Sequence, residues 1–530
     1  MDTWDTIIVG AGSAGCVLAN RLSQDPGHRV LLIESGPPDH NPFIHMPRGF
    51  GRTLADPRLM WFFPTEPEPG NGQRPFVWMR GRTLGGSSAV NGMIYVRGQP
   101  SDYDGWEALG NPGWGWRDML RAFIAIEDHE LGADEFRGAG GPLRISIQRY
   151  STPLTEAVIA AAGELGVPRK EDINRPDLEG IGYTPCTIWN GRRVSSADAF
   201  LAPIRRRPNL TVITDTQIDR IGFEGRRARS VLGQRGGQPC ELRAAHEIIL
   251  AAGTIQSPRL LQLSGIGPAA HLQAAGVQVL HDSPGVGGNV REHKLVSIQH
   301  RLSRPLSYNH AFSGLPLVWN TLKYFAARRG VLANTYDVNA FIRSRPDLPR
   351  PDVQLTMSAF SLDVAGGGTG FDSFPGMNLY GYPVLPESTG TIRIRSADPR
   401  APLEIRSNYL TAEADRRATV DMFRFMRRLL ARPVMAPFLA GETVPGAGVQ
   451  SDEEILDACA RDNSGAHAVG SCRMGADALA VVDARLRVRG VEGLRIVDLS
   501  VMPTQVSGNT SGPAMALAWR AAEFILDDRR

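Results

Sequence analysis

The chain has 530 residues, of which 42% are hydrophobic and 21% are charged. This is the composition of a globular protein, and it excludes wholesale disorder. The 58 glycines and 38 prolines follow no G-X-Y period, which excludes collagen, and they favour a loop-rich α/β or α+β protein. The formal net charge of +3 is too small to indicate nucleic acid or a membrane surface as the partner.

Cysteine usage argues against both a disulfide framework and a metal site. The five cysteines are widely spaced and form no C-x-x-C pair; they are Cys16, Cys186, Cys240, Cys459 and Cys472. We therefore expect reduced thiols and no bound metal. No run of about 18 apolar residues is present, so no membrane span is expected. Because the chain enters a strand almost at once, without room for a signal peptide, we expect a cytoplasmic protein.

The first forty residues carry the pattern of a dinucleotide-binding unit. A buried strand at 6–9 runs into G-x-G-x-x-G at 10–15, and after a helical stretch a second strand ends at Glu34. In this motif the first glycine permits a tight turn, the second lets a pyrophosphate approach the backbone, and the third lets the helix pack on the strand. Glu34 would accept hydrogen bonds from a ribose. The motif by itself leaves NAD and FAD open.

Later segments repeat the pattern of a strand and a glycine-rich turn. Residues 81–94 form a second element rich in glycine and serine, whose N–H groups and hydroxyls suit phosphates or a polar ring edge. A strand at 247–250 enters a glycine turn, after which Ser257 and Pro258 predict the N-cap and first residue of a helix. A strand at 494–498 precedes a C-terminal helix. The nucleotide domain is therefore predicted to be discontinuous.

Between about 300 and 455 the pattern changes. Residues 351–357 and 390–395 alternate like half-buried antiparallel strands, residues 412–430 are helical, and the glycine run 366–370 predicts a mobile loop. We interpret this region as a substrate domain built from a sheet and a helix.

The predicted fold class is therefore α/β, α+β overall. A discontinuous Rossmann-like cofactor domain is joined to an antiparallel-sheet substrate-binding domain. The segments assigned to the cofactor domain are 1–155, 201–300 and 461–530, and those assigned to the substrate domain are 156–200 and 301–460.

Four separated motifs together resemble the glucose–methanol–choline (GMC) family of FAD-dependent oxidoreductases, and the similarity covers essentially the whole chain. The motifs are Gly10–Gly15 with Glu34, Gly81–Asn91, Gly253–Gly267, and His467–Gly475 with Asn509. The resemblance implies an extended FAD with its pyrophosphate at the first motif. The residues that it implies for FAD binding are Gly10, Gly12, Ser13, Ala14, Gly15, Glu34, Ser35, Gly86, Ser87, Asn91, Gly92, Met93, Ile94, Ile218, Asp498, Leu499, Asn509 and Thr510.

One departure from the family pattern concerns how FAD is held. Some members attach FAD covalently through a histidine directly before the asparagine that Asn91 matches. Val90 occupies that position here. Because valine cannot form the bond, we expect FAD to be bound non-covalently.

The resemblance also assigns the catalytic residues. His467 matches the family's catalytic histidine and is the only histidine after His310, and Asn509 matches the second catalytic position. Transfer of a proton from an alcohol to a free histidine is unfavourable by about 12 kcal/mol, if water's pKa of ~15.7 stands for the alcohol and the histidine has a pKa of ~6.5. His467 must therefore act with electrostatic stabilisation of an alkoxide-like species, from the imidazolium and from Asn509. The expected reaction oxidises an alcohol to an aldehyde, with hydride transfer to flavin N5.

The sequence defines the substrate and the electron acceptor less closely than it defines the cofactor and the reaction. Tyr336, Met357 and Phe360 are candidate pocket residues, which favours a primary alcohol that is apolar or aromatic. No residue clearly supplies a carboxylate for a quaternary ammonium such as choline. The electrons pass to O2 or to another acceptor, and neither this choice nor the oligomeric state follows from the sequence.

Two other reactions are known on folds of this family, fatty-acid photodecarboxylation and hydroxynitrile cleavage. The decarboxylase branch lacks a histidine at the position of His467, and a lyase would act without reducing the flavin. Cys472, Trp114 and Trp116 are interpreted as packed core residues, and His293 is left outside the catalytic set.

Overall fold

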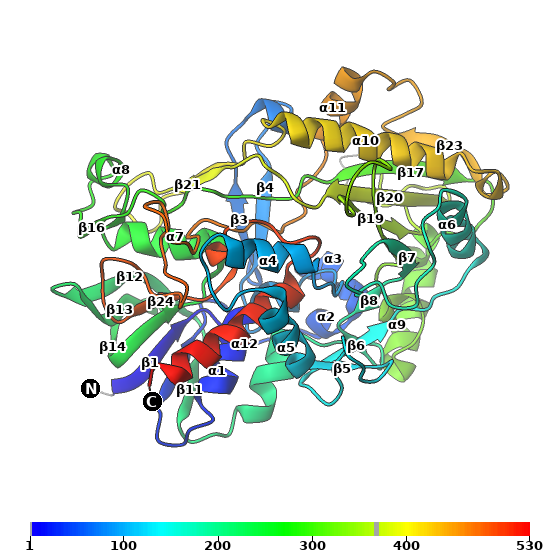
Figure 1. Ribbon diagram of the computed structural model, residues 1–530. Coiled ribbons are helices and arrows are strands. Elements are labelled where there is room, and N and C mark those ends of the chain that lie inside the picture. Colours follow the sequence, from blue (N-terminus) through cyan, green and yellow to red (C-terminus); the bar gives the residue numbers. More distant parts are fainter. Residues whose placement is uncertain (1–2, 365–369, 530) are drawn as a thin grey trace.

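Two β-sheets with separate hydrophobic cores organise the fold (Figure 1). The computed structural model describes residues 3–364 and 370–529. Of the glycine run predicted to be a mobile loop, all but Gly370 lies outside the described residues. The two ends of the chain lie close together beside the first sheet (Figure 1), where Arg529 Nη2 donates to Thr6 Oγ1 at 2.9 Å.

The first sheet draws its strands from three distant parts of the chain. In spatial order they are β11 (Leu210–Ile213), β2 (Val30–Ile33), β1 (Thr3–Val9), β14 (Gln238–Leu250), β13 (Arg227–Arg235) and β12 (Thr216–Glu224), with β24 (Leu494–Ile496) also paired to β14. β11, β2, β1, β14 and β24 run parallel. Helices α1 (Ser13–Leu22) and α12 (Ser511–Asp527) pack together beside them (Figure 1). This arrangement confirms the predicted discontinuous Rossmann-like architecture.

The register of the parallel strands brings distant residues to one edge. Val9 pairs with both Ile33 and Leu250, and Leu250 pairs in turn with Ile496. All four strands therefore end at the same level, and the residues that follow them meet there. In doubly wound sheets this carboxyl edge is where ligands bind.

The second sheet is antiparallel and confirms the predicted substrate-domain architecture. In spatial order its strands are β23 (Leu439–Val444), β17 (Val296–Leu302), β20 (Gly376–Pro383), β19 (Val353–Ser358), β18 (Val338–Ile342) and β7 (Gly180–Tyr183). Helix α10 (Glu413–Leu430) confirms the helix predicted at 412–430, and it packs against β20 and β17.

One of the two strand predictions for this region needs correction. β19 is buried along its whole length and is not half-buried, because one face packs in the second core and the other turns toward the cavity described below. Residues 390–395 contribute a strand, β21 (Thr391–Arg393), but it pairs with β22 (Glu404–Arg406) outside the main sheet.

The remaining elements connect or cover the two sheets. The helices are α2 (Pro42–His45), α3 (Phe50–Thr53), α4 (Pro100–Ala108), α5 (Trp116–Ile126), α6 (Pro153–Glu164), α8 (Ala269–Ala274), α9 (Gly314–Ala327) and α11 (Asp452–Ala460). The short strands are β3 (Met60–Pro64), β4 (Val77–Gly81), β5 (Glu127–His129), β6 (Leu143–Ile147), β8 (Pro185–Cys186), β9 (Ile188–Trp189), β10 (Arg192–Arg193), β15 (Ile266–Gly267) and β16 (His281–Asp282).

Helix α7 (Gly253–Leu263) begins earlier than predicted. Ser257 is not its N-cap, and Pro258 lies inside the helix. A proline in a helix interior cannot donate to the carbonyl four residues before it, here that of Thr254. Ser471 Oγ donates to this Thr254 oxygen at 2.6 Å and replaces the missing bond. The helix therefore continues through the proline.

Candidate active site

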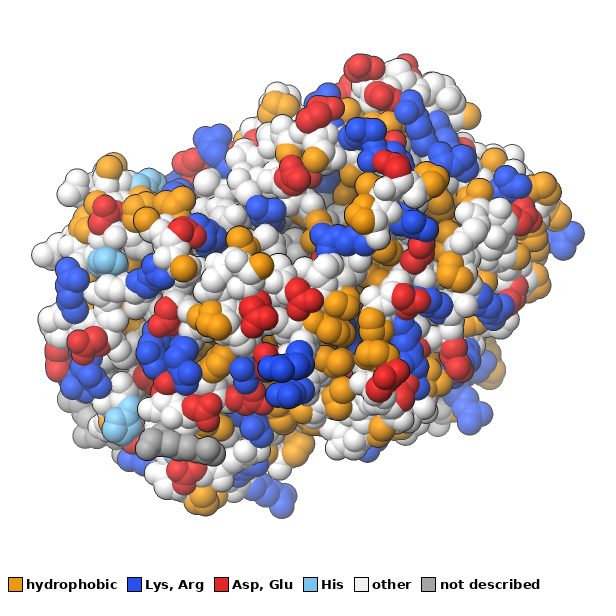
Figure 2. Space-filling model, in the orientation of Figure 1, with side chains coloured by type: hydrophobic (Ala, Val, Ile, Leu, Met, Phe, Trp, Pro, Cys, Tyr) orange, Lys and Arg blue, Asp and Glu red, His pale blue; other side chains and the backbone are white. Residues whose placement is uncertain are grey.

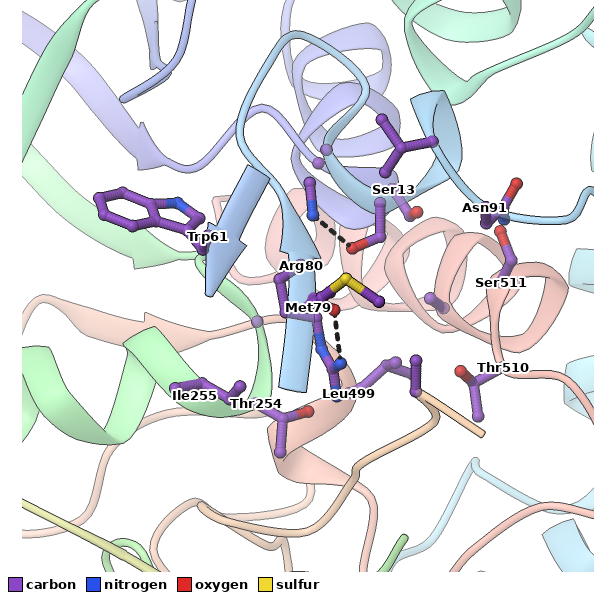
Figure 3. Close-up of a pocket in the computed structure, with 18 of the residues that line it drawn as sticks. Ser13, Trp61, Met79, Arg80, Asn91, Thr254, Ile255, Leu499, Thr510 and Ser511 are labelled. Carbon is purple, nitrogen blue, oxygen red and sulfur yellow. Dashed lines mark hydrogen bonds between the residues drawn. The ribbon is translucent and has the colours of Figure 1, made fainter. Parts of the chain in front are cut away.

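A cavity of about 450 Å³ opens at the carboxyl edge of the first sheet and is closed on another side by strands of the second. Figure 3 shows its wall, with Ser13 from α1, Met79 and Arg80 from β4, and Thr510 beside the start of α12 turned around one space. Every residue predicted to bind FAD lines this cavity except Gly15, and His467 lines it as well. The sequence motifs thus converge on one site.

The glycines of the first two motifs allow backbone segments to touch. Gly10 has φ +106°, and a Cβ on Gly15 would lie 1.9 Å from the Gly10 carbonyl oxygen. Gly15 therefore serves the packing of α1 on β1, as the motif predicts for its third glycine. Gly86, at φ +51°, would place a Cβ only 2.7 Å from the Cα of Gly12. The second glycine-rich element thus packs directly on the first.

Two helices, α1 and α12, begin at the cavity with uncapped N-termini. The residues before them, Gly12 and Thr510, make no side-chain cap, and neither helix has an acidic residue in its first turn. At a third helix, α7, the first N–H donates to the Asp498 carboxylate. Elsewhere Thr152 and Ser451 do cap α6 and α11. Uncapped N–H groups and the positive end of the helix dipole favour phosphates and other anions. The cavity therefore fits a dinucleotide with its diphosphate.

Two acidic side chains on the cavity wall already have several hydrogen-bond partners. Glu34 accepts from the N–H of Ala11 at 3.0 Å and from that of Gly36 at 2.9 Å. Asp498 accepts from Gly253 N–H at 2.8 Å and from the Ser257 hydroxyl at 2.6 Å. Burial raises the pKa of both carboxyl groups. The Asp498 carboxylate thereby ties the end of β24 to the start of α7.

His467 and Asn509 meet at the other end of the cavity. Asn509 Nδ2 lies 3.1 Å from His467 Nε2. The residues come from separate segments, one after α11 and the other directly before α12. The structure therefore brings the two predicted catalytic residues together.

Hydrogen bonds determine which nitrogen of His467 is free. His293 Nε2 lies 2.8 Å from the Val384 carbonyl oxygen, which can only accept, so this nitrogen carries a hydrogen. Neutral His293 then presents a lone pair at Nδ1, which lies 3.0 Å from His467 Nδ1. His467 must donate from Nδ1, and its Nε2 keeps the lone pair. The base site of His467 thus points toward Asn509 and the cavity.

The amide of Asn509 is oriented in the same way. Gln354 Nε2 donates to Asn509 Oδ1 at 2.9 Å, so the Asn509 NH2 group turns toward His467. Tyr382 donates its hydroxyl to Gln354 Oε1 at 2.6 Å. The Tyr382 ring also stacks on His293, with centroids 4.3 Å apart. These contacts connect His467 and Asn509, the two predicted catalytic residues, through Gln354, Tyr382 and His293.

Glu292 joins the two loops that carry the histidines. Its Oε1 accepts from the backbone N–H of His467 at 2.7 Å and from that of His293 at 2.9 Å. Its Oε2 faces Arg80 Nη2 at 3.6 Å. Burial raises the pKa of Glu292, and the Arg80 charge opposes this shift.

The pKa values of both histidines are lowered, so neither ring is protonated by water at neutral pH. Burial lowers the pKa of His293 to about 4. Burial, the largest cause, lowers the pKa of His467 well below its usual range, and repulsion by a protonated His293 and by Arg80 adds to this shift. At neutral pH both rings are therefore uncharged, and the His467 base is available.

The structure also corrects the predicted pocket residues. Tyr336 lines the cavity, but Met357 and Phe360 do not. Strand residues alternate in direction, so on β19 Thr356 faces the cavity while Met357 packs in the second core. Side chains that the sequence did not single out complete this wall: Phe50, Leu295, Tyr380 and Tyr382.

Other sequence interpretations concern residues away from the chemistry. Trp114 is fully buried, and Trp116 packs against the first core, which confirms both as core residues. Cys472 is buried in the same core, and burial raises its pKa, as expected for an inert thiol. His293, which the sequence analysis left outside the catalytic set, contacts His467 through its ring. No pattern along the chain marks this contact or that of Gln354, and only the Glu-His pair at 292–293 hints at a polar function.

Comparison with known proteins decides the family. Residues 4–295 and 386–518 match the two GMC oxidoreductase family models. The chain belongs to the GMC oxidoreductase family. It is 39% identical to mouse mitochondrial choline dehydrogenase, over 99% of this chain and 89% of that protein. It is 38% identical to alcohol dehydrogenase [acceptor] of Pseudomonas putida, over 99% of this chain and 96% of that protein.

Solved structures of this GMC oxidoreductase's relatives have the same fold. Pyridoxine 4-oxidase from Mesorbium loti is 34% identical with a TM-score of 0.89, over 98% of this chain and 99% of that one. An FAD-dependent oxidoreductase from Chaetomium thermophilum is 28% identical with a TM-score of 0.89, over the full length of both chains. The uncapped helix ends and the glycine contacts of the cavity fit FAD, and FAD is the cofactor of this oxidoreductase.

The side chains around the cavity bear on how FAD is held. Of the described residues that line it, none is a cysteine and His467 is the only histidine. Val90, at the position used for covalent attachment in some relatives, also lines the cavity. These residues agree with the expected non-covalent binding.

In the part of the chain that the structure describes, no helix is long and apolar enough to cross a membrane. No group of three or more His, Cys, Asp and Glu side chains in residues 3–364 and 370–529 is placed to hold a metal ion.

Proposed function

We propose that this protein oxidises a primary alcohol, apolar or aromatic, to the aldehyde, with His467 as the general base and Asn509 as its partner. The observation that carries the proposal is the free Nε2 of His467, which His293 keeps unprotonated and which lies 3.1 Å from Asn509 Nδ2. When bound, FAD supplies the acceptor for the hydride that leaves the alcohol carbon.

The residues at the site suit the proton transfer. His467 Nε2 accepts the proton of the alcohol O–H, a step more than about 12 kcal/mol uphill without assistance, because the pKa of His467 lies below that of a free histidine. His293 Nδ1 accepts a hydrogen bond from the resulting imidazolium at Nδ1, which stabilises the positive charge. Once His467 is protonated, its Nε2 no longer accepts from Asn509, and the Asn509 N–H can donate to the alkoxide-like oxygen.

The cavity wall supports an apolar or aromatic substrate. Six aromatic side chains line it, namely Phe50, Trp61, Phe63, Tyr336, Tyr380 and Tyr382. The Tyr336 ring lies 5.8 Å from that of Tyr380 and 6.4 Å from that of Phe50. Such rings bury apolar area and pack against other aromatic groups.

Choline is the second candidate, since relatives 39% identical are named choline dehydrogenases and aromatic rings also bind quaternary ammonium groups. Two observations argue against it. Among the described residues of the wall the acidic side chains are Glu34 and Asp498, whose oxygens already accept hydrogen bonds. The Arg80 charge, which lowers the pKa of His467, would also repel a cation there.

Anaerobic mixing of the FAD-loaded protein with a panel of alcohols tests the reaction. We expect benzyl alcohol and other apolar primary alcohols to bleach the flavin absorbance, with kcat/KM for benzyl alcohol at least about tenfold above that for choline. A higher kcat/KM for choline would overturn the substrate proposal. Admission of air then separates an oxidase, which recolours fast and forms peroxide, from a dehydrogenase, which recolours slowly.

The His467→Ala variant tests the base. We expect flavin reduction to slow by a factor of about 100 or more while FAD stays bound, since general bases contribute about 10²–10⁴-fold. Replacement of the exposed His310 by alanine is the matched control. Reduction at the parent rate in His467→Ala would overturn the assignment. The names of the relatives, dehydrogenases of choline and alcohol, do not favour a lyase or a photodecarboxylase.

We also propose the division of the chain and the residues that hold FAD. Segments 1–155, 201–300 and 461–530 would form the FAD domain, and 156–200 and 301–460 the substrate domain. The sheet memberships support this division, except that β17 begins at Val296 and pairs within the second sheet. The predicted FAD-binding residues other than Gly15 are supported by their positions on the cavity wall.

A further inference from the structure

Helix α9 exposes an unusual amount of apolar surface. Its large exposed side chains are Leu315, Val318, Trp319, Leu322 and Phe325, with Leu315 84% and Trp319 68% exposed. Their spacing of three or four residues places them along one side of the helix. The other large exposed hydrophobic side chains of the described residues are scattered over many elements, and single ones are normal. The cluster on α9 is not.

The helix lies at the outside of the molecule and is held by few contacts. Figure 1 shows it at the lower right edge, away from the body of both sheets. Tyr324 is its one buried residue, and the Tyr324 hydroxyl donates to the His45 carbonyl oxygen at 3.3 Å. The helix packs on the short helices at Asn309–Phe312 and Val331–Ala333. Its apolar side is therefore left facing outward.

The chain segment that carries α9 has charges of one sign only. Residues 293–336 contain no Asp or Glu. Lys323 lies on the helix, and Arg328 and Arg329 follow its end. On the face seen in Figure 2, in contrast, positive and negative side chains are interspersed. The net charge of +3 for the whole chain hides this local concentration of positive charge.

We propose that α9 is a membrane-surface helix, whose apolar side inserts at the headgroup level of an anionic lipid bilayer. Apolar side chains with Trp among them, next to basic residues, are typical of helices that lie in this interface. Fourteen residues span about 21 Å, too short to cross a bilayer, so the helix lies along its surface. Lys323 and Arg329 bind lipid phosphates through charge attraction.

Charge argues for a bilayer and against a second copy of the chain. A symmetric dimer through α9 would set the same surface against itself. Lys323, Arg328 and Arg329 of each copy would then face those of the other, without acidic residues in the same segment to neutralise them. An anionic membrane supplies the opposite charge.

The position of α9 relates the membrane to the cavity. Tyr324 contacts His45, the last residue of α2, and a short helical turn at Pro47–Gly49 then leads into α3. Phe50 and Leu54 of this same stretch line the cavity. Apolar alcohols dissolved in the bilayer would therefore be concentrated beside the wall of the active site.

Sedimentation of the FAD-loaded protein with phosphatidylcholine vesicles, with and without phosphatidylglycerol, tests the proposal. We expect binding to the anionic vesicles at low salt and weaker binding at high salt. Lys323→Gln with Arg329→Gln should lower vesicle affinity about 25-fold, because each charge near an anionic surface contributes about fivefold. Leu315→Ser with Trp319→Ser should lower it at least about tenfold.

Matched variants show that the effect belongs to α9. Arg205→Gln with Arg206→Gln removes two exposed charges elsewhere, and Leu109→Ser with Leu479→Ser removes two exposed apolar groups. These variants should bind vesicles like the parent. All variants should keep the flavin absorbance, which shows that they are folded and hold FAD. They should also turn over a water-soluble alcohol at the parent rate, so that loss of membrane binding is distinguished from failure of the proposed reaction.

Three outcomes would overturn the proposal. The parent could fail to sediment with anionic vesicles. The α9 variants could bind them as well as the parent does. Light scattering could show a dimer that the α9 changes dissociate, without vesicle binding, which would assign the surface to a second copy of the chain.

Discussion

His293 Nδ1 lies 3.0 Å from His467 Nδ1, and the two rings meet edge to face with centroids 5.2 Å apart. His293 itself donates to the Val384 carbonyl, so it can only accept from His467. A residue that acts through another in this way is a positioning residue. It selects the tautomer of His467 and stabilises its protonated form.

The first prediction replaces this positioning residue. His293→Phe keeps a flat ring against Tyr382 but removes the acceptor for His467 Nδ1. We expect kcat to fall about 10–100-fold with little change in KM, as for other groups that orient a catalytic ligand. His293→Asn retains an acceptor near the Nδ1 position and should recover part of the rate. Equal rates in both variants would show that His293 has no role beyond packing.

The second prediction concerns stability at acid pH. Burial lowers the pKa of folded His293 to about 4, whereas an exposed histidine in the unfolded chain has a pKa of ~6.5. The unfolded state therefore binds a proton that the folded state does not, and stability falls as the pH drops from about 6.5 to about 4. The contribution of this group is about 3 kcal/mol.

Unfolding in denaturant at several pH values measures this loss. His293→Asn should flatten the dependence of the free energy of unfolding on pH in that window. The matched control replaces the exposed His310 by asparagine and should leave the dependence as in the parent. An unchanged slope in His293→Asn would contradict the prediction.

The third prediction tests the contact between the two glycine-rich motifs. In Gly86→Ala the new methyl group would lie 2.7 Å from the Gly12 Cα, at φ +51°. Because neither backbone can yield without moving the diphosphate site, we expect FAD affinity to fall at least about tenfold. Gly163→Ala in α6 is the control, since nothing lies within 4 Å of its added Cβ. The measurement is the ratio of flavin to protein absorbance after purification, which should fall in Gly86→Ala and stay at the parent value in Gly163→Ala.

The fourth prediction tests how α7 accommodates its proline. Ser471→Ala leaves the Thr254 carbonyl without the donor that replaces the missing N–H of Pro258, and should cost about 1–2 kcal/mol of unfolding free energy. In a Pro258→Ala background the restored N–H can bond to Thr254, so the same serine change should cost less. The double-mutant cycle measures the coupling. Equal costs in the two backgrounds would show that the serine does not serve this carbonyl.

The sequence by itself determined the features that short segments encode. The first strand, the glycine turn and the second strand, which ends at Glu34, lie within 34 residues. Gly10 and Gly15 are needed there because a side chain would clash with nearby backbone. Motifs of similar length identified the discontinuous cofactor domain, His467 and Asn509. Such motifs can be recognised in the sequence because their physical causes act between neighbours along the chain.

Only the tertiary structure decided how the groups proposed to be catalytic are oriented. His293 and His467 are 174 positions apart, Gln354 and Asn509 are 155 apart, and Ser471 and Thr254 are 217 apart. Strand register and packing between the two sheets bring these pairs within hydrogen-bond distance, and no segment of the sequence contains that information. The same cause explains why Thr356, and not Met357, faces the cavity: which side of a strand faces the cavity depends on the elements that cover its two faces.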